Sequence, residues 1–569
     1  MSPALAAAGA FLLYLAAYQF YSRFLAKRIF ALDDAAATPA HTQRDDVDYV
    51  PTRPAVLFGH HFASITGLAP MLGPAVAVIW GWVPALLWVV FGAIFIGAVH
   101  DFGAMVLSVR SRGMSVGEVT RDLVGRRAGL LFHLIIFFGI ALAMGVFVFV
   151  ISKLFSLYLD PGKTHEGYPQ AVFPSASLMV VAMVAGILMH KRGVALLPVA
   201  IVGFAIELFT IWFGMRYPTL GIAPEYWPSS DTWTWILLAY AFAASVLPVW
   251  ALLQSRDFLN ALLLYLGLGL AYLGLFAGGH EFVAPAVNAH PEGAPPMLPF
   301  VFIIIACGAA SGFHGLVSSG TTAKQLDRET HARPIGYGAM LGESTLGLLA
   351  TLACTAGIAS KDLWHSHYSS WDAVSALPKK IDAFIQGTTS FVTSLGVPAD
   401  LAAALIAMVV VSFALTTLDS ATRLLRFNIE EIGSRLRMPF LVNRYVASVA
   451  ACAVIGLFAF FEIDGKPAGL ALWALFGTTN QLLAALTLSL VTLYLKRRGK
   501  SVWYTGIPAL FVMSTTLTAM ARNLGDFCPL SGFEGSQPNG LLFGVGTVLF
   551  LLGIAVLVET GLAMGRKTA

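Results

Sequence analysis

The feature that most constrains this chain is a series of apolar segments, each about twenty residues long, that recurs from one end of the sequence to the other. Such a segment crosses roughly 30 Å of hydrocarbon as a helix, which satisfies its own backbone groups where water is absent. Only 12% of the 569 residues are charged, about half the fraction of a soluble domain. The sequence therefore predicts an all-α polytopic membrane protein. The strands of a barrel would be shorter and would alternate.

We expect about fifteen transmembrane helices, with the lipid bilayer as a partner. They are predicted at 3–22, 58–80, 82–107, 128–158, 174–190, 194–216, 233–254, 258–277, 298–318, 337–358, 398–418, 443–461, 467–494, 502–521 and 540–563. Basic residues gather in alternate connections, such as 110–127 and 423–444. By the positive-inside rule the N-terminus lies outside and the C-terminus in the cytoplasm. The net charge of +4 is thus a topology signal, and we expect no nucleic-acid partner.

Two of these spans contain helix-breaking residues near their middle. The second contains GLAPMLGP, from Gly67 to Pro74, and the seventh contains Pro248. Interrupted helices at corresponding positions of two inverted halves are typical of secondary transporters. We therefore expect a five-plus-five inverted repeat whose two breaks face each other. The first repeat is assigned to 53–216 and the second to 233–427, with an N-terminal accessory helix at 1–30 and C-terminal accessory helices at 441–569.

An opened helix exposes backbone groups that can bind a solute. Proline and glycine open it, and the free amides of a following half-helix attract an anion. A kink that merely helps helices pack is the alternative, and two prolines with two glycines in eight residues make it the weaker one. The substrate-binding candidates lie at or near the breaks and in the ninth span. They are Ser64, Thr66, Gly67, Ala69, Pro70, Gly73, Ser245, Pro248, Trp250, Ser311 and His314.

Ionisable and hydroxyl side chains within spans are candidates for ion coupling. Intramembrane charges are rare and functional by default, and histidine titrates near neutral pH. The candidates are His61, His100, Asp101, His314, Ser318, Ser319, Thr322 and Asp419. The coupling ion is expected to be a proton, with sodium on the serine and threonine hydroxyls as the alternative.

Each of these candidates has a structural alternative. His60 and His61 are equally well interpreted as interfacial caps, and His100 with Asp101 as a buried structural pair. A salt bridge to Arg423, four residues further along the helix, is slightly favoured for Asp419.

Other polar residues in spans are interpreted as structural. Glu207 and Glu343 are lone carboxylates, and Asn480 with Gln481 would bond helices together. The four cysteines are scattered, so we expect no disulfide, metal or other cofactor. Walker A and HExxH motifs are absent from the sequence, which argues against an ATP-driven pump and against a zinc hydrolase of the HExxH type.

Five stretches together resemble the carbon starvation protein A family. They are RPAVLFGHHFASITGLAPMLGPAVA, ASVLPVW with RDFLN, CGAASGFHGLVSSGTTAKQL, TTLDSATRLLRF and FGTTNQLLAAL, which run from about 53 to 486. The resemblance implies a bacterial inner-membrane transporter of the amino acid–polyamine–organocation superfamily with the leucine-transporter type of inverted repeat. It also implies uptake of peptides during carbon starvation or proton-coupled uptake of pyruvate.

Two functions of different class follow. The first is a secondary importer of peptides or pyruvate that works by alternating access. The second is a membrane sensor, or a redox or metal-binding subunit, that uses the intramembrane histidines. The interrupted spans favour the transporter. The choice between peptide and pyruvate, the choice between proton and sodium, and the oligomeric state stay open at this point.

Overall fold

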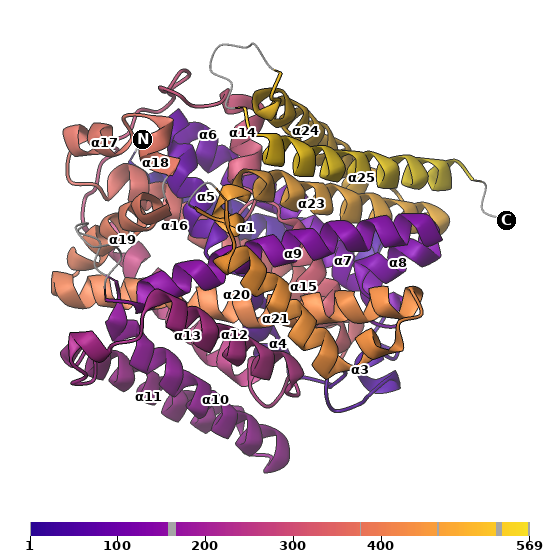
Figure 1. Cartoon of the computed structure of the whole chain (residues 1–569), viewed down its shortest axis with the longest axis horizontal. Coiled ribbons are helices and arrows are strands. Elements are labelled where there is room, and N and C mark those ends of the chain that lie inside the picture. The colour runs from indigo at the N-terminus through magenta and orange to yellow at the C-terminus, as the bar shows by residue number, and fades with distance from the viewer. Residues whose placement is uncertain (1, 158–166, 376, 464–465, 531–537, 567–569) are drawn as a thin grey trace.

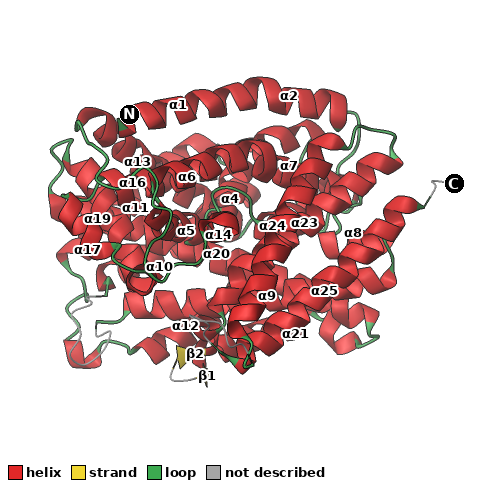
Figure 2. Ribbon diagram, turned by 90° about the horizontal axis from the view of Figure 1, so that it is seen from above, coloured by secondary structure: helices red, strands yellow, loops and turns green. Residues whose placement is uncertain are grey.

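The structure is a computed structural model of the whole chain. It describes residues 2–157, 167–375, 377–463, 466–530 and 538–566. Residue 158 of the fourth predicted span, and the extreme ends of the two accessory segments, lie outside the described residues. Figures 1 and 2 show an almost entirely helical bundle.

The elements of the first half are α1 (Pro3–Ala16), η1 (Ala17–Tyr21), α2 (Ser22–Phe24), η2 (Leu25–Ile29), α3 (Pro39–Thr42), α4 (Pro54–Ile65), α5 (Ala69–Ala77), η3 (Val78–Trp80), α6 (Trp82–Leu87), η4 (Trp88–Gly97), α7 (Ala98–Arg110), α8 (Val116–Leu123), α9 (Arg126–Phe155), η5 (Pro169–Ala171), α10 (Val172–Lys191), α11 (Leu196–Arg216), η6 (Pro224–Tyr226), α12 (Ser230–Val246) and α13 (Leu253–Ala277).

The elements of the second half are α14 (Met297–Ile304), α15 (Gly312–Gly320), η7 (Thr322–Lys324), η8 (Glu329–His331), η9 (Arg333–Gly338), α16 (Ala339–Ala356), α17 (Lys361–His367), α18 (Trp371–Ser375), α19 (Leu377–Thr393), α20 (Ala399–Arg435), η10 (Pro439–Val442), α21 (Arg444–Phe460), β1 (Glu462–Ile463), β2 (Lys466–Pro467), α22 (Ala468–Ala471), α23 (Trp473–Arg497), α24 (Trp503–Phe527) and α25 (Gly540–Gly565). The strands β1 and β2 form a small antiparallel pair.

The predicted class is confirmed at the level of a multi-pass helical membrane protein. Within the described residues, 10 continuous helices are long and apolar enough to cross a membrane, or 11 if the bent pair α4 and α5–η3 is one span. The other predicted spans correspond to shorter, interrupted or less apolar helices, namely α12, α14–α15, α21 and α24.

The predicted interruption of the second span is confirmed. The segments α4 and α5–η3 meet at a bend of 46°, and residues 66–68 between α4 and α5 lie outside both helices. Pro70 is at the second position of α5, where a missing N–H removes no helical hydrogen bond. Gly73 lets the backbone of α5 approach α14, because a Cβ atom there would lie 2.5 Å from the carbonyl oxygen of Ile304.

The predicted break at Ser245–Pro248 is wrong as a mid-span interruption. The helix α12 ends at Val246, Pro248 lies in the connection, and α13 begins at Leu253. Leu247 is extended, which is the conformation that a following proline favours. This proline therefore ends one helix and does not open a continuous span.

The second interrupted span is α14–α15, whose halves are separated by residues 305–311. This stretch contains one glycine, Gly308, and no proline, so its sequence does not show a cluster of helix-breaking residues like that of the second span. Gly308 has φ +87, and a Cβ atom at this position would lie 3.7 Å from Pro70 of α5 and 3.4 Å from Gly347 of α16, while α14 itself packs on α5. The two interrupted spans therefore pack directly against each other.

The long helices α9 and α20 pack against each other and bury most of their apolar residues. The helices α10 and α11 form a hairpin at the edge of the bundle, and α24 and α25 cover the opposite edge (Figure 1). The interrupted spans thus lie in the interior, enclosed by continuous helices.

We predict that Gly73→Ala destabilises the protein. The added methyl group would collide with the carbonyl oxygen of Ile304, and overpacking of about 1–3 kcal/mol exceeds the gain of about 1 kcal/mol in helix propensity. The check is a lower Tm in detergent. Gly269→Ala on α13, where a Cβ atom would meet nothing within 4 Å, is the matched control, and its Tm should stay the same or rise because it gains helix propensity without a collision. An unchanged Tm for Gly73→Ala would contradict the close packing.

Candidate functional site

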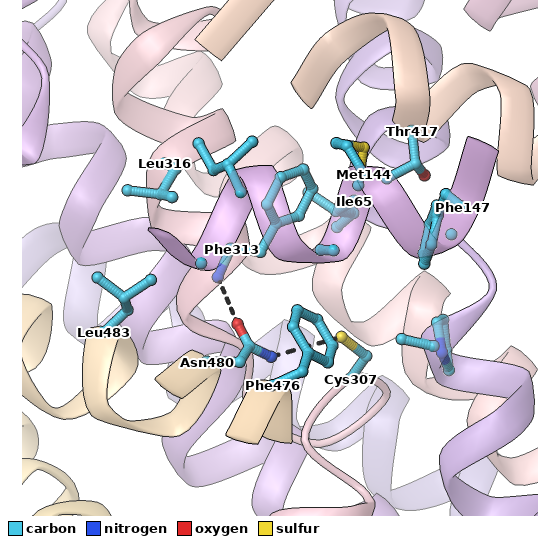
Figure 3. A pocket seen from close by; sticks show the side chains of 16 residues that line it. Ile65, Met144, Phe147, Cys307, Phe313, Leu316, Thr417, Phe476, Asn480 and Leu483 are labelled. Atoms are coloured by element: carbon cyan, nitrogen blue, oxygen red, sulfur yellow. Dashed lines mark hydrogen bonds between the residues drawn. The ribbon is translucent and has the colours of Figure 1, made fainter. Parts of the chain in front are cut away.

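A pocket of about 500 Å³ lies against the break between α4 and α5 (Figure 3). Of the predicted substrate residues, Gly67, Ala69 and Pro70 line it. The remaining wall comes from α9, the α14–α15 span, α20 and α23, and most of it is apolar. Its lining residues include Ile140, Met144, Phe147, Phe313 and Phe476.

Asn480 of α23 provides the main polar contact of this pocket. Its Oδ1 accepts a hydrogen bond from the backbone N–H of Phe313 at 2.9 Å, and so caps the start of α15. Its Nδ2 donates to Ser311 at 3.1 Å and to the sulfur of Cys307 at 3.7 Å. Asn480 and Cys307 both line the pocket, as Figure 3 shows. The N-termini of α5 and α15 therefore both border the cavity, and each is the positive end of a helix dipole.

Two hydroxyl groups lie at the break without a hydrogen-bond partner in the described part of the chain. Thr417 of α20 lines the pocket beside Gly67, and Thr66 ends α4. Both hydroxyl oxygens are buried. Buried polar atoms of this kind are available to a bound solute.

Three predicted substrate residues lie away from the pocket. The hydroxyl of Ser245 is 3.0 Å from that of Ser448 on α21. Trp250 stacks on His190 and donates a hydrogen bond to the backbone of Asp46. Ser245, Pro248 and Trp250 were expected at the pocket because the sequence placed the second break beside them. The helix α12 ends at Val246, and none of these three residues lines the pocket. Gly73 also lies behind the wall, packed on α14.

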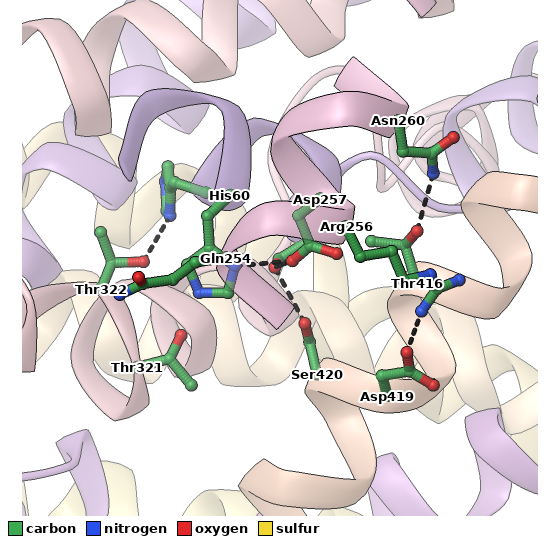
Figure 4. Close-up of polar contacts among 12 residues, drawn as sticks. His60, Gln254, Arg256, Asp257, Asn260, Thr321, Thr322, Thr416, Asp419 and Ser420 are labelled. Atoms are coloured by element: carbon green, nitrogen blue, oxygen red, sulfur yellow. Dashed lines mark hydrogen bonds and ion pairs between the residues drawn. The ribbon is translucent and has the colours of Figure 1, made fainter. Parts of the chain in front are cut away.

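A polar network joins α4, α13 and α20 (Figure 4). The Nδ1 atom of His60 lies 2.6 Å from the carboxylate of Asp257. Ser64 donates to the same carboxylate at 3.2 Å, and its oxygen is 2.9 Å from that of Ser420. His60 and His61 are fully buried, so their interpretation as interfacial caps is wrong.

Asp419 pairs with a different arginine from the one expected. Its carboxylate contacts Arg256 of α13 and the hydroxyl of Tyr240 of α12. Arg423 instead binds Asp48, with 2.6 Å between Nη1 and Oδ1. The helix spacing allowed the Arg423 pair, but α13 brings a nearer cation to Asp419.

The hydroxyls proposed for sodium do not converge on one point. Thr322 bonds Nδ1 of His61 at 2.8 Å. Ser319 accepts from the N–H of Val116 and donates to the carbonyl of Gly315. The oxygen of Ser318 has no partner among the described residues.

Four buried ionisable side chains form one chain of contacts. The two carboxylate oxygens of Asp101 each contact one histidine. Oδ1 lies 2.7 Å from Nδ1 of His100, and Oδ2 lies 3.0 Å from Nδ1 of His314. The other ring nitrogen of His314 lies 3.3 Å from a carboxylate oxygen of Glu343 on α16. Glu343 is therefore not a lone carboxylate, which corrects its interpretation from sequence.

Two groups of three side chains have atoms close enough for a metal ion, within 4.8 Å of one another. They are Cys307, His314 and Glu343, and Glu118, His133 and Glu431. In the first group the 3.3 Å contact between His314 and Glu343 is that of a direct ion pair. In the second, Arg435 binds Glu118 and Ser115 binds Glu431. Each group thus has protein partners of its own, and we assign neither group as metal ligands.

One side of the bundle is held by an ion-pair cluster. Asp48, in the connection before α4, contacts both Arg423 and Arg426 of α20. Burial opposes the charge of this carboxyl, but the two arginines and Lys324 hold the pKa of Asp48 below its usual range. A second, smaller cavity of about 310 Å³ lies nearby, lined by Ser319, Lys324, Asn428 and Glu431 among others.

Comparison with known proteins identifies the family. The sequence profile described as "Carbon starvation protein CstA" matches residues 3–381 and 366–519. The chain belongs to the carbon starvation protein CstA family. The "Peptide transporter CstA" of Campylobacter jejuni is 32% identical over 89% of this chain and 78% of its own length. The "Pyruvate/proton symporter BtsT" of Escherichia coli is 34% identical over 91% and 81%, and the "Peptide transporter CstA" of Bacillus subtilis is 31% identical over 95% and 94%.

Among solved structures, a manganese transporter from Eremococcus coleocola aligns with a TM-score of 0.44 and 12% identity. The alignment covers 92% of this chain and 99% of that one.

Sequence reasoning missed several residues of this interior. Asn480 was read only as a link between helices, and Cys307 and Asp257 were not singled out. The signal for Arg256 and Asp257 was present, since an adjacent charge pair in an apolar segment is rare. Cys307 carries no such signal, because a buried cysteine is ordinary in a core.

We predict that Arg256→Gln strongly destabilises the protein, because it leaves the buried carboxylate of Asp419 without its cation. Removal of one partner of a buried ion pair costs about 3–5 kcal/mol. The apolar double variant Arg256→Met, Asp419→Leu should recover most of the lost Tm, and Arg216→Gln at an exposed arginine should leave it unchanged. A double variant less stable than Arg256→Gln would argue against this pairing.

Proposed function

We propose that this protein is a secondary active transporter that imports a small carboxylate-bearing solute, either pyruvate or a short peptide, together with protons. The observation that carries the proposal is a pocket at two interrupted spans that pack against each other. Substrate sites of secondary transporters are built at such breaks. Relatives that this chain matches over most of their length are named as a peptide transporter and a pyruvate/proton symporter.

The pocket suits a small carboxylate with an apolar body. The N-terminus of α5 and the free hydroxyl of Thr417 offer donors to an anion. The amide of Asn480 would become a third donor by exchanging its bonds to Ser311 and Cys307 for a bond to the solute. The apolar wall would receive a methyl group or a peptide side chain. No lysine or arginine occurs among the described residues that line this pocket, so helix dipoles and a co-transported proton would offset the negative charge.

A five-plus-five repeat is part of the proposal, with boundaries that differ from those expected. The first unit is α4–α5, α6–α7, α9, α12 and α13, and α10–α11 is an inserted hairpin. The second unit is α14–α15, α16, α20, α21 and α23. With α1, α24 and α25 as accessory helices, these assignments add up to the fifteen spans expected. Units of five crossings have opposite orientations in the membrane.

The helix contacts support this division. The first element of each unit packs on the second of the other, as α5 on α16 and α15 on α7. The first and fifth elements pack within each unit, as α4 on α13 and α15 on α23. The third of each unit packs on the fourth of the other, as α9 on α21 and α20 on α12. Three kinds of contact therefore occur twice, as a two-fold repeat requires.

We favour a proton over sodium as the coupling ion. Asp419 is already paired with Arg256, and Ser319 and Thr322 are bonded to different neighbours. The buried chain from His100 to Glu343 offers groups that exchange protons. A proton would also offset the work of moving an anion against an inside-negative potential, about 2.3 kcal/mol per 100 mV.

We place the protein in the cytoplasmic membrane of a bacterium, with the N-terminus outside and the C-terminus in the cytoplasm. The distribution of basic loops supports this orientation. It puts the ion-pair cluster of Asp48, Arg423 and Arg426 on the cytoplasmic side, where it would close the pathway in this conformation. A sensor or redox subunit is not favoured, because the relatives named above are transporters.

We predict substrate accumulation in proteoliposomes under an inward proton gradient. Labelled pyruvate and a labelled dipeptide are tested separately, and one of them should accumulate without sodium. Collapse of the gradient by a protonophore should abolish accumulation. Uptake of both that follows an imposed sodium gradient, and is indifferent to the proton gradient, would refute proton coupling.

We predict that Asn480→Ala raises the KM for the transported solute at least about tenfold, since a hydrogen bond to a charged group is worth about 1.5–3 kcal/mol. The control is Asn288→Ala, because the Nδ2 of Asn288 donates to the carbonyl of Ile79 outside the pocket lining. Both variants are compared at equal Tm or with a correction for the folded fraction. An unchanged KM for Asn480→Ala would remove this residue from the site.

A further inference from the structure

Glu343 is the least satisfied member of the buried ionisable chain. Among the described residues, none forms a hydrogen bond of good geometry with either of its oxygens, and its polar neighbours are Nε2 of His314 at 3.3 Å and the backbone N–H of Gly308. Asp101, by contrast, receives the two histidines, one on each oxygen. Hydrogen bonds to the ionised form hold a carboxylate ionised. Asp101 is therefore the fixed anion of the chain, and Glu343 is the carboxylate that is free to take a proton.

The charges in contact with His314 are compatible with this. Two carboxylates, those of Asp101 and Glu343, contact the single imidazole of His314 in a fully buried place, so these three groups carry one net negative charge when both carboxylates are ionised and His314 is protonated. An uncompensated charge in a low-dielectric interior is costly. One additional proton makes these three groups neutral. His314 lies between two carboxylates and is held cationic by both, so it is the stable partner and not the group that releases its proton.

The other titratable groups near α16 come from several elements. α5, α6 and η4 bring none, and α19 meets α16 at its far end, where Gly387 touches Ala353 and Gly357. The helix α4 brings His60, which is bonded to Asp257 of α13, and His61, which interacts electrostatically with Asp101 and His314. Arg256 of α13 is paired with Asp419, Tyr265 of α13 is exposed, and Arg333 of η9 is bonded to Ser22. Cys307 lies beside His314. Tyr14 of α1 is bonded to Ser344, Tyr272 of α13 to the carbonyl of Thr345, and Tyr337 of η9 to the carbonyl of Ile94. The three tyrosine hydroxyls are bonded to other groups, which leaves the histidines and Cys307 to respond to Glu343.

The break in the α14–α15 span connects this chain to the pocket. Cys307 lies in the break, lines the pocket, and has its sulfur within 4.8 Å of atoms of both His314 and Glu343. Gly308, the next residue, touches Gly347 one turn along α16 from Glu343. A solute that displaces the break would therefore move groups in contact with Glu343.

We propose that Glu343 is the residue that binds and releases the coupling proton, with His314 as its fixed cationic partner and Asp101 as the anchor of that histidine. The inference rests on the proposed function. A proton from the side of higher proton concentration forms an O–H bond with the Glu343 carboxylate. The bond breaks on the other side, after the carrier has changed its access, and the proton returns to water.

The experiment compares Glu343→Gln with Glu207→Gln in proteoliposomes. Glu207 of α11 is a matched control, because its carboxylate is also buried and has no hydrogen-bond partner in the described part of the chain. Each variant is tested for accumulation under a pH gradient and for counterflow exchange of labelled substrate, which needs no net proton movement. Glu343→Gln should lose accumulation and retain counterflow. Glu207→Gln should retain both.

Accumulation by Glu343→Gln at the wild-type level would overturn the assignment, as would loss of both activities by a variant with a wild-type Tm. If Glu343→Gln does not fold, Glu343→Asp decides. A shifted pH midpoint of accumulation supports the proposal, and an unchanged pH profile overturns it. Wild-type protein that shows counterflow but no pH-driven accumulation would instead refute the proton coupling on which the assignment rests.

Discussion

The contact between the two interrupted spans is the constraint on which the rest of this structure depends. A backbone that leaves the helical path inside a membrane must be buried in protein or line a cavity. Here each break provides the cover for the other, with Gly73 against Ile304 and Pro70 against Gly308. The enclosing helices α9, α20 and α23 complete the cover and form the pocket wall. The site is thus a consequence of how the open backbone is sheltered.

The buried charged side chains also compensate one another, in pairs of opposite charge. Asp419 has Arg256, Asp257 has His60, and Asp101 has two histidines. The pairs Asp419–Arg256, Asp257–His60 and Asp101–His314 each join two helices, so a change in helix arrangement would expose or separate charges. Glu343 stands apart because its single ionic contact is the far nitrogen of His314. Within the chain from His100 to Glu343, this carboxylate is therefore the one best suited to link protonation to movement.

The family resemblance agrees with the comparisons, and the chain spans most of the length of its curated relatives. Those relatives are named for different solutes, a peptide and pyruvate. Pyruvate and a peptide both have a carboxylate and a small apolar part. The pocket has hydrogen-bond donors that suit the first and an apolar wall that suits the second. An undivided apolar wall beside one amide and one free threonine is compatible with either, which gives a physical reason why one architecture could serve both.

The sequence by itself determined the class of fold, an interruption of the second span near Gly67, and the presence of ionisable side chains, such as His314 and Asp101, within apolar spans. Span length, helix-breaking residues and intramembrane charges can each be recognised within a single stretch of sequence, without knowledge of the residues that pack against it. Only the tertiary structure decided where the second break lies, since residues 305–311 open without a proline, while Pro248 merely ends a helix. It also decided the partners. Asp419 pairs with Arg256 and not with Arg423, and Glu343 lies beside His314. Distance in the folded bundle, and not spacing along one helix, sets which charged groups are in contact.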